Sequence, residues 1–409
     1  MSTPEPIAIV GAGPSGLLLA VYLEQHHIPV VVYEGDPHPH YRPQGGSLDL
    51  HEDTGLLALK ETNLLQEASV MMRQEGEAMK VADKTGKIWL DENVQEGEEK
   101  KFAEGDEVTG RPEIDRTDLR NLLINSLSPS TIQWDHKIIS VKAINPSLYQ
   151  IEFRNKPSIT TPYLVGADGA FSLIRPLLHN IKPDYSGISM YDLSISPENL
   201  TPELEAFIGK GAMMMLDDGK AFMPQMNSKR SCKVYLALKC SREWQDENPL
   251  PESGRKQWLC DLFQEWTPIT HEVIMASTEE TIYPRRIWQF DPDIKWETDK
   301  TGVTVMGDAA HVMSPFAGEG VNQALADALL LGQTLVPIFT SPSTNTSAVA
   351  PSPQALHEAL RSFEKQMLAR AKEEMIGSKE NMDIFFGEEA AQHLAEFLAN
   401  RGQPPLDMH

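Results

Sequence analysis

The stretch "IAIVGAGPSG", Ile7–Gly16, decides the fold of this 409-residue chain. Its apolar first half predicts a short buried strand, and a helical pattern, Leu17–His26, follows the glycines. A second apolar run, Pro29–Tyr33, ends in Glu34, eighteen residues after the last glycine. A strand, a glycine-rich turn, a helix and an acid after the next strand form a dinucleotide-binding unit. We therefore expect an α/β protein with a Rossmann-like domain.

Each residue type in this turn has a physical role. Gly11 allows a tight turn, Gly13 allows a pyrophosphate to approach the backbone, and Gly16 allows close helix–strand packing. The helix start offers unpaired N–H groups to phosphates, and Glu34 can accept hydrogen bonds from ribose hydroxyls. The alternative is a glycine-rich turn without a ligand. The predicted cofactor contacts of this unit are Gly11, Gly13, Pro14, Ser15, Gly16 and Glu34.

A second stretch, "VTVMGDAAHVMSPFAGEGVN", Val303–Asn322, predicts a buried strand, a carboxylate at its end and a glycine-rich turn before a helix. Asp308 suits the hydroxyls of a ribityl chain, and a helix start can stabilise negative charge on a reduced flavin ring. Two distant segments at one sheet edge favour a long cofactor, so we expect FAD. The alternative for Asp308 is a structural helix cap.

Three further motifs, "VGADGAFSLIR" (Val165–Arg175), "GGSLDLH" (Gly45–His51) and "RPEIDRTDLRNLL" (Arg111–Leu123), complete a pattern. With them the chain resembles the group A flavoprotein aromatic hydroxylases, and most closely the tetracycline-inactivating FAD monooxygenases, over essentially its whole length. The resemblance implies cofactor contacts by Asp49, Arg116, Asp168, Gly169, Asp308, Pro315, Gly318, Gly320, Val321 and Asn322, and NADPH binding by Arg42. For Arg42 the alternative is a surface ion pair, and for Arg116 an ion pair at a helix start.

The resemblance also implies an activity: NADPH reduces FAD, O2 adds to form a flavin C4a-hydroperoxide, and one oxygen atom enters a small organic substrate. The flavin carries this chemistry, so no catalytic side chain is assigned. Met190 and Ala212 are apolar where tetracycline-inactivating members carry a polar Gln and an Arg. We therefore expect an aromatic or polyketide-like acceptor, and leave a tetracycline-like acceptor, with a role in antibiotic resistance, open. An epoxidase, an oxidase and a non-catalytic flavin-binding protein remain alternatives.

Two other features have both a functional and a structural interpretation. His311 lacks a catalytic partner at a useful spacing, so we expect a structural hydrogen bond near a strand–loop junction. Methionines are pliable and polarizable, so several of them could line a substrate pocket, although core packing explains them as well. The candidate pocket residues are Met190, Met213, Met215, Met223, Pro315 and Phe316.

The domain organisation follows from changes in pattern along the chain. We expect a FAD-binding domain built from residues 1–73, 101–178 and 282–338, and a sheet-containing substrate domain built from residues 74–100 and 179–281. A low-complexity loop, 339–353, precedes a C-terminal helical region, 354–409, that starts with a long helix, Gln354–Ile376.

The composition of the chain argues against several classes of function. The chain has 36 Lys and Arg against 59 Asp and Glu, a net charge of −23 that would repel nucleic acid. Part of this acidity is a run, Asp91–Glu107, best explained as a solvated loop. The three cysteines lack metal-ligand spacing, and no apolar run reaches the roughly 20 residues of a membrane span. The start "MSTPEP" does not resemble a signal peptide. We expect a cytoplasmic monomer without metal or membrane anchor.

Overall fold

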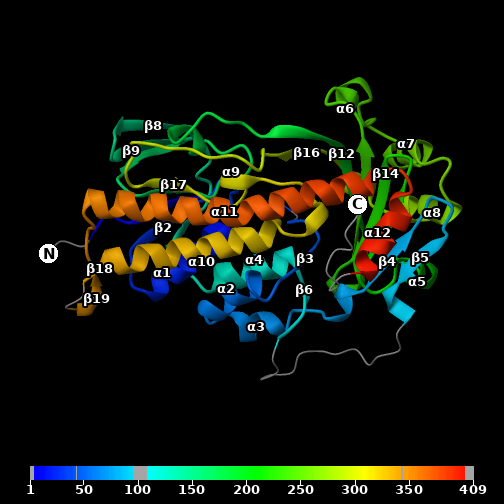
Figure 1. The fold of residues 1–409 in the computed structure, drawn as a ribbon, viewed down its shortest axis with the longest axis horizontal. Helices are drawn as coiled ribbons and strands as arrows, with labels where there is room; N and C mark the ends of the chain where they lie inside the picture. Colours follow the sequence, from blue (N-terminus) through cyan, green and yellow to red (C-terminus); the bar gives the residue numbers. More distant parts are fainter. Residues whose placement is uncertain (1–3, 43, 95–107, 342–343, 401–409) are drawn as a thin grey trace, which may run out of the picture. The chain divides into compact units, whose positions relative to one another are not determined.

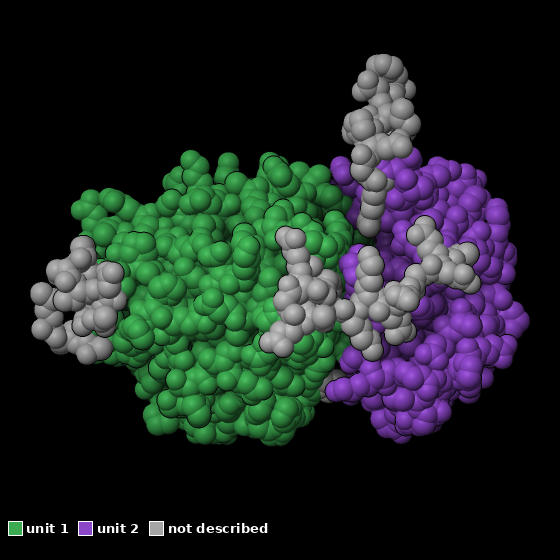
Figure 2. Space-filling model, turned by 90° about the horizontal axis from the view of Figure 1, so that it is seen from below, with its two compact units in different colours: residues 1–72, 102–184, 288–378 green, residues 73–101, 185–287, 379–409 purple. Residues whose placement is uncertain are grey.

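The computed structural model describes residues 4–42, 44–94, 108–341 and 344–400. Most of the acidic run, residues 95–107, lies outside them. The chain forms two compact units, shown in different colours in Figure 2. Unit 1 comprises residues 1–72, 102–184 and 288–378, and unit 2 comprises residues 73–101, 185–287 and 379–409.

Unit 1 is built on a five-stranded sheet in the order β17-β11-β1-β2-β7, in which every neighbouring pair is parallel. Parallel strands place their carboxyl ends at one edge, where ligands of open α/β sheets bind. The strands are β1 (Ile7–Val10), β2 (Val30–Tyr33), β7 (Ile132–Gln133), β11 (Leu164–Gly166) and β17 (Val303–Val305).

The first turn folds as its glycines require. Gly11 has φ +108°, and a Cβ there would stand 2.2 Å from the carbonyl oxygen of Ala167. A Cβ on Gly16 would stand 2.1 Å from the carbonyl oxygen of Gly11. Only glycine therefore permits this contact between strand end and helix. Helix α1 (Pro14–Gln25) then begins with a proline, which needs no hydrogen-bond partner for its nitrogen.

Helices and small sheets complete unit 1. Helices α1 and α10 (Gly320–Phe339) lie side by side, with α2 against α10 (Figure 1). The other helices are α2 (Gly55–Glu61), α3 (Leu65–Ser69), α4 (Arg116–Asn125), α9 (Asp308–His311), and the 3-10 turns η3 (Arg175–Leu177) and η6 (Pro315–Ala317). The other strands pair antiparallel: β3 (Ser47–Asp49) with β6 (Glu113–Asp115), and β9 (Leu148–Phe153) with β8 (Ile138–Asn145) and β10 (Lys156–Thr161).

Unit 2 contains a seven-stranded sheet in the order β16-β12-β15-β14-β13-β4-β5. Its strands are β4 (Met79–Ala82), β5 (Ile88–Asp91), β12 (Asp184–Ile195), β13 (Ala212–Asp217), β14 (Lys220–Met226), β15 (Cys232–Lys239) and β16 (Tyr283–Gln289). Its helices and 3-10 turns are η1 (Glu75–Glu77), η2 (Glu92–Val94), α5 (Pro202–Ile208), η4 (Ser228–Arg230), α6 (Trp244–Glu247), α7 (Arg255–Leu262), α8 (Pro268–Ala276), η5 (Glu279–Thr281) and α12 (Ala390–Ala399).

Two C-terminal features differ from the sequence-based expectation. The segment 339–353 is not a plain loop, because β18 (Thr340–Ser341) and β19 (Thr344–Ala348) form an antiparallel hairpin. The polar composition of this segment favoured a loop prediction, although threonine, a β-branched residue, is also compatible with a strand. Helix α11 (Pro353–Phe385) is longer than expected. The helix that follows it, α12, belongs to unit 2, where it packs on β13 and β4.

None of the helices in the described part of the chain combines the length and hydrophobicity that a membrane span requires. The described residues also contain no cluster of His, Cys, Asp and Glu that could hold a metal ion.

Candidate functional site

Four neighbouring strands of unit 1 end in residues that the sequence singled out. Across the edge of the sheet these are Asp308 after β17, Asp168 after β11, Gly11 after β1 and Glu34 after β2. Three strand spacings of about 4.8 Å separate the outer two, roughly 14 Å in all. The fold thus aligns the predicted contacts in a row long enough for an extended ligand.

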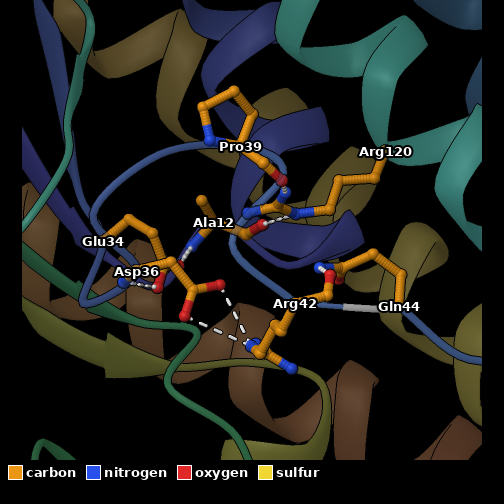
Figure 3. A network of polar contacts seen from close by, with 7 residues as sticks. All are labelled: Ala12, Glu34, Asp36, Pro39, Arg42, Gln44 and Arg120. Atoms are coloured by element: carbon orange, nitrogen blue, oxygen red, sulfur yellow. Dashed lines mark hydrogen bonds and ion pairs between the residues drawn. The ribbon is translucent and has the colours of Figure 1, made fainter. Parts of the chain in front are cut away.

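Glu34 is fixed at one end of this row. Its Oε2 accepts a hydrogen bond from the backbone N–H of Ala12 at 2.7 Å, and its Oε1 accepts one from the N–H of Asp36 at 2.8 Å (Figure 3). The carboxylate is therefore held directly beside the glycine turn, and each oxygen keeps lone pairs for a further donor.

Arg120 was not foreseen at this end of the site. It is buried, and its guanidinium donates to the carbonyl oxygens of Ala12 at 3.1 Å and Pro39 at 2.7 Å (Figure 3). Burial lowers the pKa of Arg120, and the negative charges of Glu34 and Asp36 oppose this. The sequence feature that could have identified Arg120 is its position among leucines on the buried face of α4.

Arg42 forms the ion pair that was its alternative interpretation. Its Nε lies 3.0 Å and 3.2 Å from the two carboxylate oxygens of Asp36 (Figure 3). The side chain is 59% exposed, and its Nη groups donate to no described residue. The structure therefore places a reachable guanidinium on Asp36, whose N–H donates to Glu34, and NADPH binding stays a prediction.

Asp308 lies at the other end of the row, and solvent reaches it although Ala309 and Ala310 beside it are buried. Burial nevertheless raises the pKa of Asp308, while the charges of His311 and Arg116 oppose the rise. Solvent exposure and a pKa raised by burial are compatible if protein atoms surround the carboxylate on most sides and leave one side open to solvent. Asp308 accepts no hydrogen bond from the described residues, and Gly307 is the N-cap residue of α9, so the helix-cap interpretation lacks support.

The residues at this edge fit a long dinucleotide such as FAD. A Cβ added at Gly13, Gly169 or Gly320 would meet nothing within 4 Å, so three predicted contacts expose bare backbone to open space. The Oδ1 atom of Asp168 is buried without a hydrogen-bond partner among the described residues. Burial raises the pKa of Asp168, although hydrogen bonds from Ser172 and Leu173 oppose the rise.

Asn322 joins two distant parts of the site. Its Oδ1 accepts from the N–H of His51 at 3.0 Å, and its Nδ2 donates to the carbonyl oxygen of Asp49 at 2.9 Å. The side chain is thus occupied within the protein. Gly318, with φ +74°, brings its backbone so close that a Cβ would stand 3.1 Å from the carboxylate of Asp49. Val321, the residue before Asn322, packs its side chain into the hydrophobic core.

His311 makes the hydrogen bond expected of it, and its partner is Asp327, which the sequence did not reveal. The two side chains are buried, with His311 Nε2 2.6 Å from Asp327 Oδ2. The same Oδ2 accepts from the N–H of Gly307 at 2.8 Å, and Oδ1 pairs with Arg370. Burial would raise the pKa of Asp327, but His311 and Arg370 outweigh this and lower it. The network holds the backbone immediately before Asp308.

The candidate pocket methionines do not share a surface, which corrects the expectation. Met213 and Met215 are fully buried in the hydrophobic core of unit 2. Met190 and Met223 lie outside that core cluster. Met215 pairs across the sheet with Phe222, so Met213 and Met215 share the core face, whereas Met223, the residue after Phe222, points to the opposite face. Pro315 and Phe316 belong to unit 1, where Pro315 is exposed and Phe316 is buried.

Comparisons with known proteins identify the family and the fold of this chain. The family described as FAD binding domain matches residues 5–343. "Monooxygenase penA" of Penicillium thymicola is 30% identical over 96% of this chain and 98% of its own length. Klebsiella pneumoniae HpxO, solved with FAD and uric acid, has a similar fold: TM-score 0.72, 19% identity, 97% of this chain and 93% of that chain. The tetracycline destructase Tet(51) also shares the fold, with TM-score 0.67, 18% identity, 99% of this chain and 100% of that chain.

Proposed function

This chain belongs to the family of FAD-dependent aromatic hydroxylases, which are monooxygenases, and we propose that it uses NADPH and O2 to hydroxylate an aromatic or polyketide-like small molecule. The observation that carries the proposal is the row from Glu34 to Asp308, where open glycine backbone and a free carboxylate lie along one sheet edge. Bound FAD would supply the redox chemistry, taking a hydride from NADPH and activating O2.

Different residues of the row would bind different parts of the cofactor. Glu34 would accept hydrogen bonds from the ribose, and the N–H groups at the start of α1 would hold the pyrophosphate. Asp308 would accept hydrogen bonds from the ribityl hydroxyls. The N–H groups at Gly318 to Gly320 lie at the start of α10, whose positive end favours negative charge on the flavin ring.

One face of the unit 2 sheet supports an aromatic acceptor. Asp192 pairs across the sheet with Tyr235, and Tyr235 with Met223, so the three side chains share a face. Met190, two residues before Asp192, faces the same way. The face opposite to it packs into the unit 2 core. The face that carries Asp192 therefore offers two polarizable side chains, an aromatic ring and a carboxylate.

Asp192 gives this face a polar anchor. It is 5% exposed, its Oδ2 lies 2.6 Å from Nε of Arg285, and its Oδ1 has no hydrogen-bond partner among the described residues. Burial raises the pKa of Asp192, and the charges of Arg285 and Lys233 oppose the rise. Buried acceptors normally have partners. A hydroxyl of a phenolic substrate would supply the missing donor.

NADPH oxidation by the purified protein, followed against a panel of phenols, aromatic polyketides and a tetracycline, tests the proposal. We expect at least one compound to accelerate NADPH oxidation and to gain one oxygen atom from 18O2, detected by mass spectrometry. The Asp192→Asn variant should raise KM for that compound more than it lowers kcat. If no compound gains labelled oxygen and only hydrogen peroxide forms, the proposed reaction is wrong.

A further inference from the structure

His51 lies between two carboxylates in unit 1. Its Nε2 is 2.8 Å from Oδ2 of Asp49, at the end of β3, and its Nδ1 is 3.0 Å from Oε1 of Glu319, in the turn before α10. The His51 side chain is 8% exposed and that of Glu319 12%. The Asp49 side chain is 28% exposed, so water has little access to the ring and to Glu319 but reaches part of Asp49.

The geometry assigns a charge to the ring. A neutral imidazole carries one N–H and one lone pair, so one of the two carboxylates would face a lone pair at hydrogen-bond distance. A doubly protonated ring donates to both. Burial alone would lower the pKa of His51, but the hydrogen bonds and charges of Asp49 and Glu319 outweigh this and raise it to about 9.

A third acid faces the same group. Burial raises the pKa of Glu374 on α11, the charge of Glu319 raises it further, and that of His51 lowers it. His51 is therefore the cation among Asp49, Glu319 and Glu374. Removing its charge would leave carboxylates facing one another where little water can screen them.

The bridge connects the two segments that make the flavin end of the predicted site. Asp49 belongs to "GGSLDLH", while Glu319 stands between Gly318 and Gly320, whose N–H groups would bind the ring. Asn322 ties the same segments through backbone groups. We propose that His51 is a positioning residue for the flavin: its imidazolium clamps Asp49 to Glu319 and so fixes the Gly318–Gly320 turn.

The proposal predicts how flavin affinity depends on pH. A histidine with a raised pKa contributes fully below about pH 6.5, its unperturbed value, and loses its contribution as pH rises through about 9. FAD binding should therefore weaken across this window. Replacing His51 by the neutral donor glutamine should weaken FAD binding at neutral pH by about tenfold to a hundredfold, the equivalent of one charged hydrogen bond, and remove most of the pH dependence.

The experiment uses flavin-free full-length protein and FAD, with Kd measured by fluorescence titration from about pH 6 to about pH 10. The variants are His51→Gln and the control His26→Gln, whose ring bonds a backbone carbonyl at 2.8 Å instead of carboxylates. Wild type and the control should lose affinity together above about pH 8, whereas His51→Gln should be weaker and nearly flat. Titration of ring-labelled histidines by NMR, without flavin, should show a signal with a pKa near 9 that disappears in His51→Gln, while the signal of His311, whose pKa Asp327 also raises, stays.

Equal affinities, or the same pH slope, in His51→Gln and wild type would overturn the proposal. If His51→Gln does not fold, Glu319→Gln serves instead, because it keeps the ring and removes one carboxylate. Its His51 signal should titrate at a lower pH than in wild type, and an unchanged titration would equally refute the clamp.

Discussion

Replacing Asp327 by asparagine should weaken the flavin site from a distance. The carboxylate is fully buried and receives three donors: the N–H of Gly307, the ring of His311 and the guanidinium of Arg370. An asparagine loses the charge and turns an N–H2 group toward one of these donors. The change therefore leaves positive groups unpaired and loosens the backbone before Asp308.

The magnitude follows from these contacts. Removing one partner of a buried ion pair costs about 3–5 kcal/mol. Arg370 is 29% exposed and water can hydrate it once it is released, so we expect the lower end, about 3 kcal/mol. Since the pKa of Asp327 is lowered, its contribution is complete at neutral pH and is lost only as the pH falls through that lowered value.

Urea denaturation and hydrogen exchange measure the two parts of this effect. The Asp327→Asn variant should unfold at a lower urea concentration, and peptides containing Gly307 should exchange faster. Glu364→Gln is the matched control, because Glu364 is also buried but bonds Thr304 inside β17. Both variants should lose stability, and only Asp327→Asn should bind FAD more weakly while still folded. Wild-type exchange at Gly307 in Asp327→Asn would refute the reasoning.

Four other substitutions test the cofactor contacts and the two faces of the unit 2 sheet. Asp308→Ala should weaken FAD binding about a hundredfold, since charge-assisted hydrogen bonds are worth roughly 1.5–3 kcal/mol each; unchanged flavin occupancy would contradict this role. Arg42→Ala should leave folding and FAD binding intact but raise the NADPH concentration for half-maximal reduction in stopped flow, and an unchanged curve would exclude Arg42 as the coenzyme contact. Met213→Ala should destabilise unit 2 by about 2–5 kcal/mol with KM unaffected, whereas Met223→Ala should raise KM for the organic substrate with a smaller loss of stability; the reverse pattern would contradict the assignment of the two sheet faces.

The fold and the site residues could be predicted from the sequence where the signal lies within a short segment. Strand β1, the Gly11 and Gly16 turn and helix α1 follow from a short run whose apolar periodicity and glycine spacing have one stereochemical solution. Glu34 and Asp308 were foreseen because each directly follows a buried strand, and the topology brings such strand ends to one edge.

Contacts across long sequence separations were not foreseeable in the same way. The hydrogen bond from the backbone N–H of His51 to the side-chain oxygen of Asn322 spans 271 residues, and no pattern near either residue encodes it. Asp327 was missed because a carboxylate inside an apolar helix identifies no partner by itself. The sequence could not separate the core residues Met213 and Met215 from Met190 and Met223 for another reason: shifting by one residue along a strand reverses the face, and the sequence "AMMMLD" of β13 offers no alternation to fix it.

The nucleotide that the protein retains distinguishes a site for one long flavin dinucleotide from a site for a shorter ligand. The row from Glu34 to Asp308 is argued to hold one dinucleotide, with its adenosine at the Glu34 end and its flavin at the Asp308 end. Purified protein, incubated with a mixture of FAD, FMN and NAD, washed and then denatured, should release FAD into the supernatant on chromatography. Release of FMN or NAD instead, or of no nucleotide at all, would contradict the account.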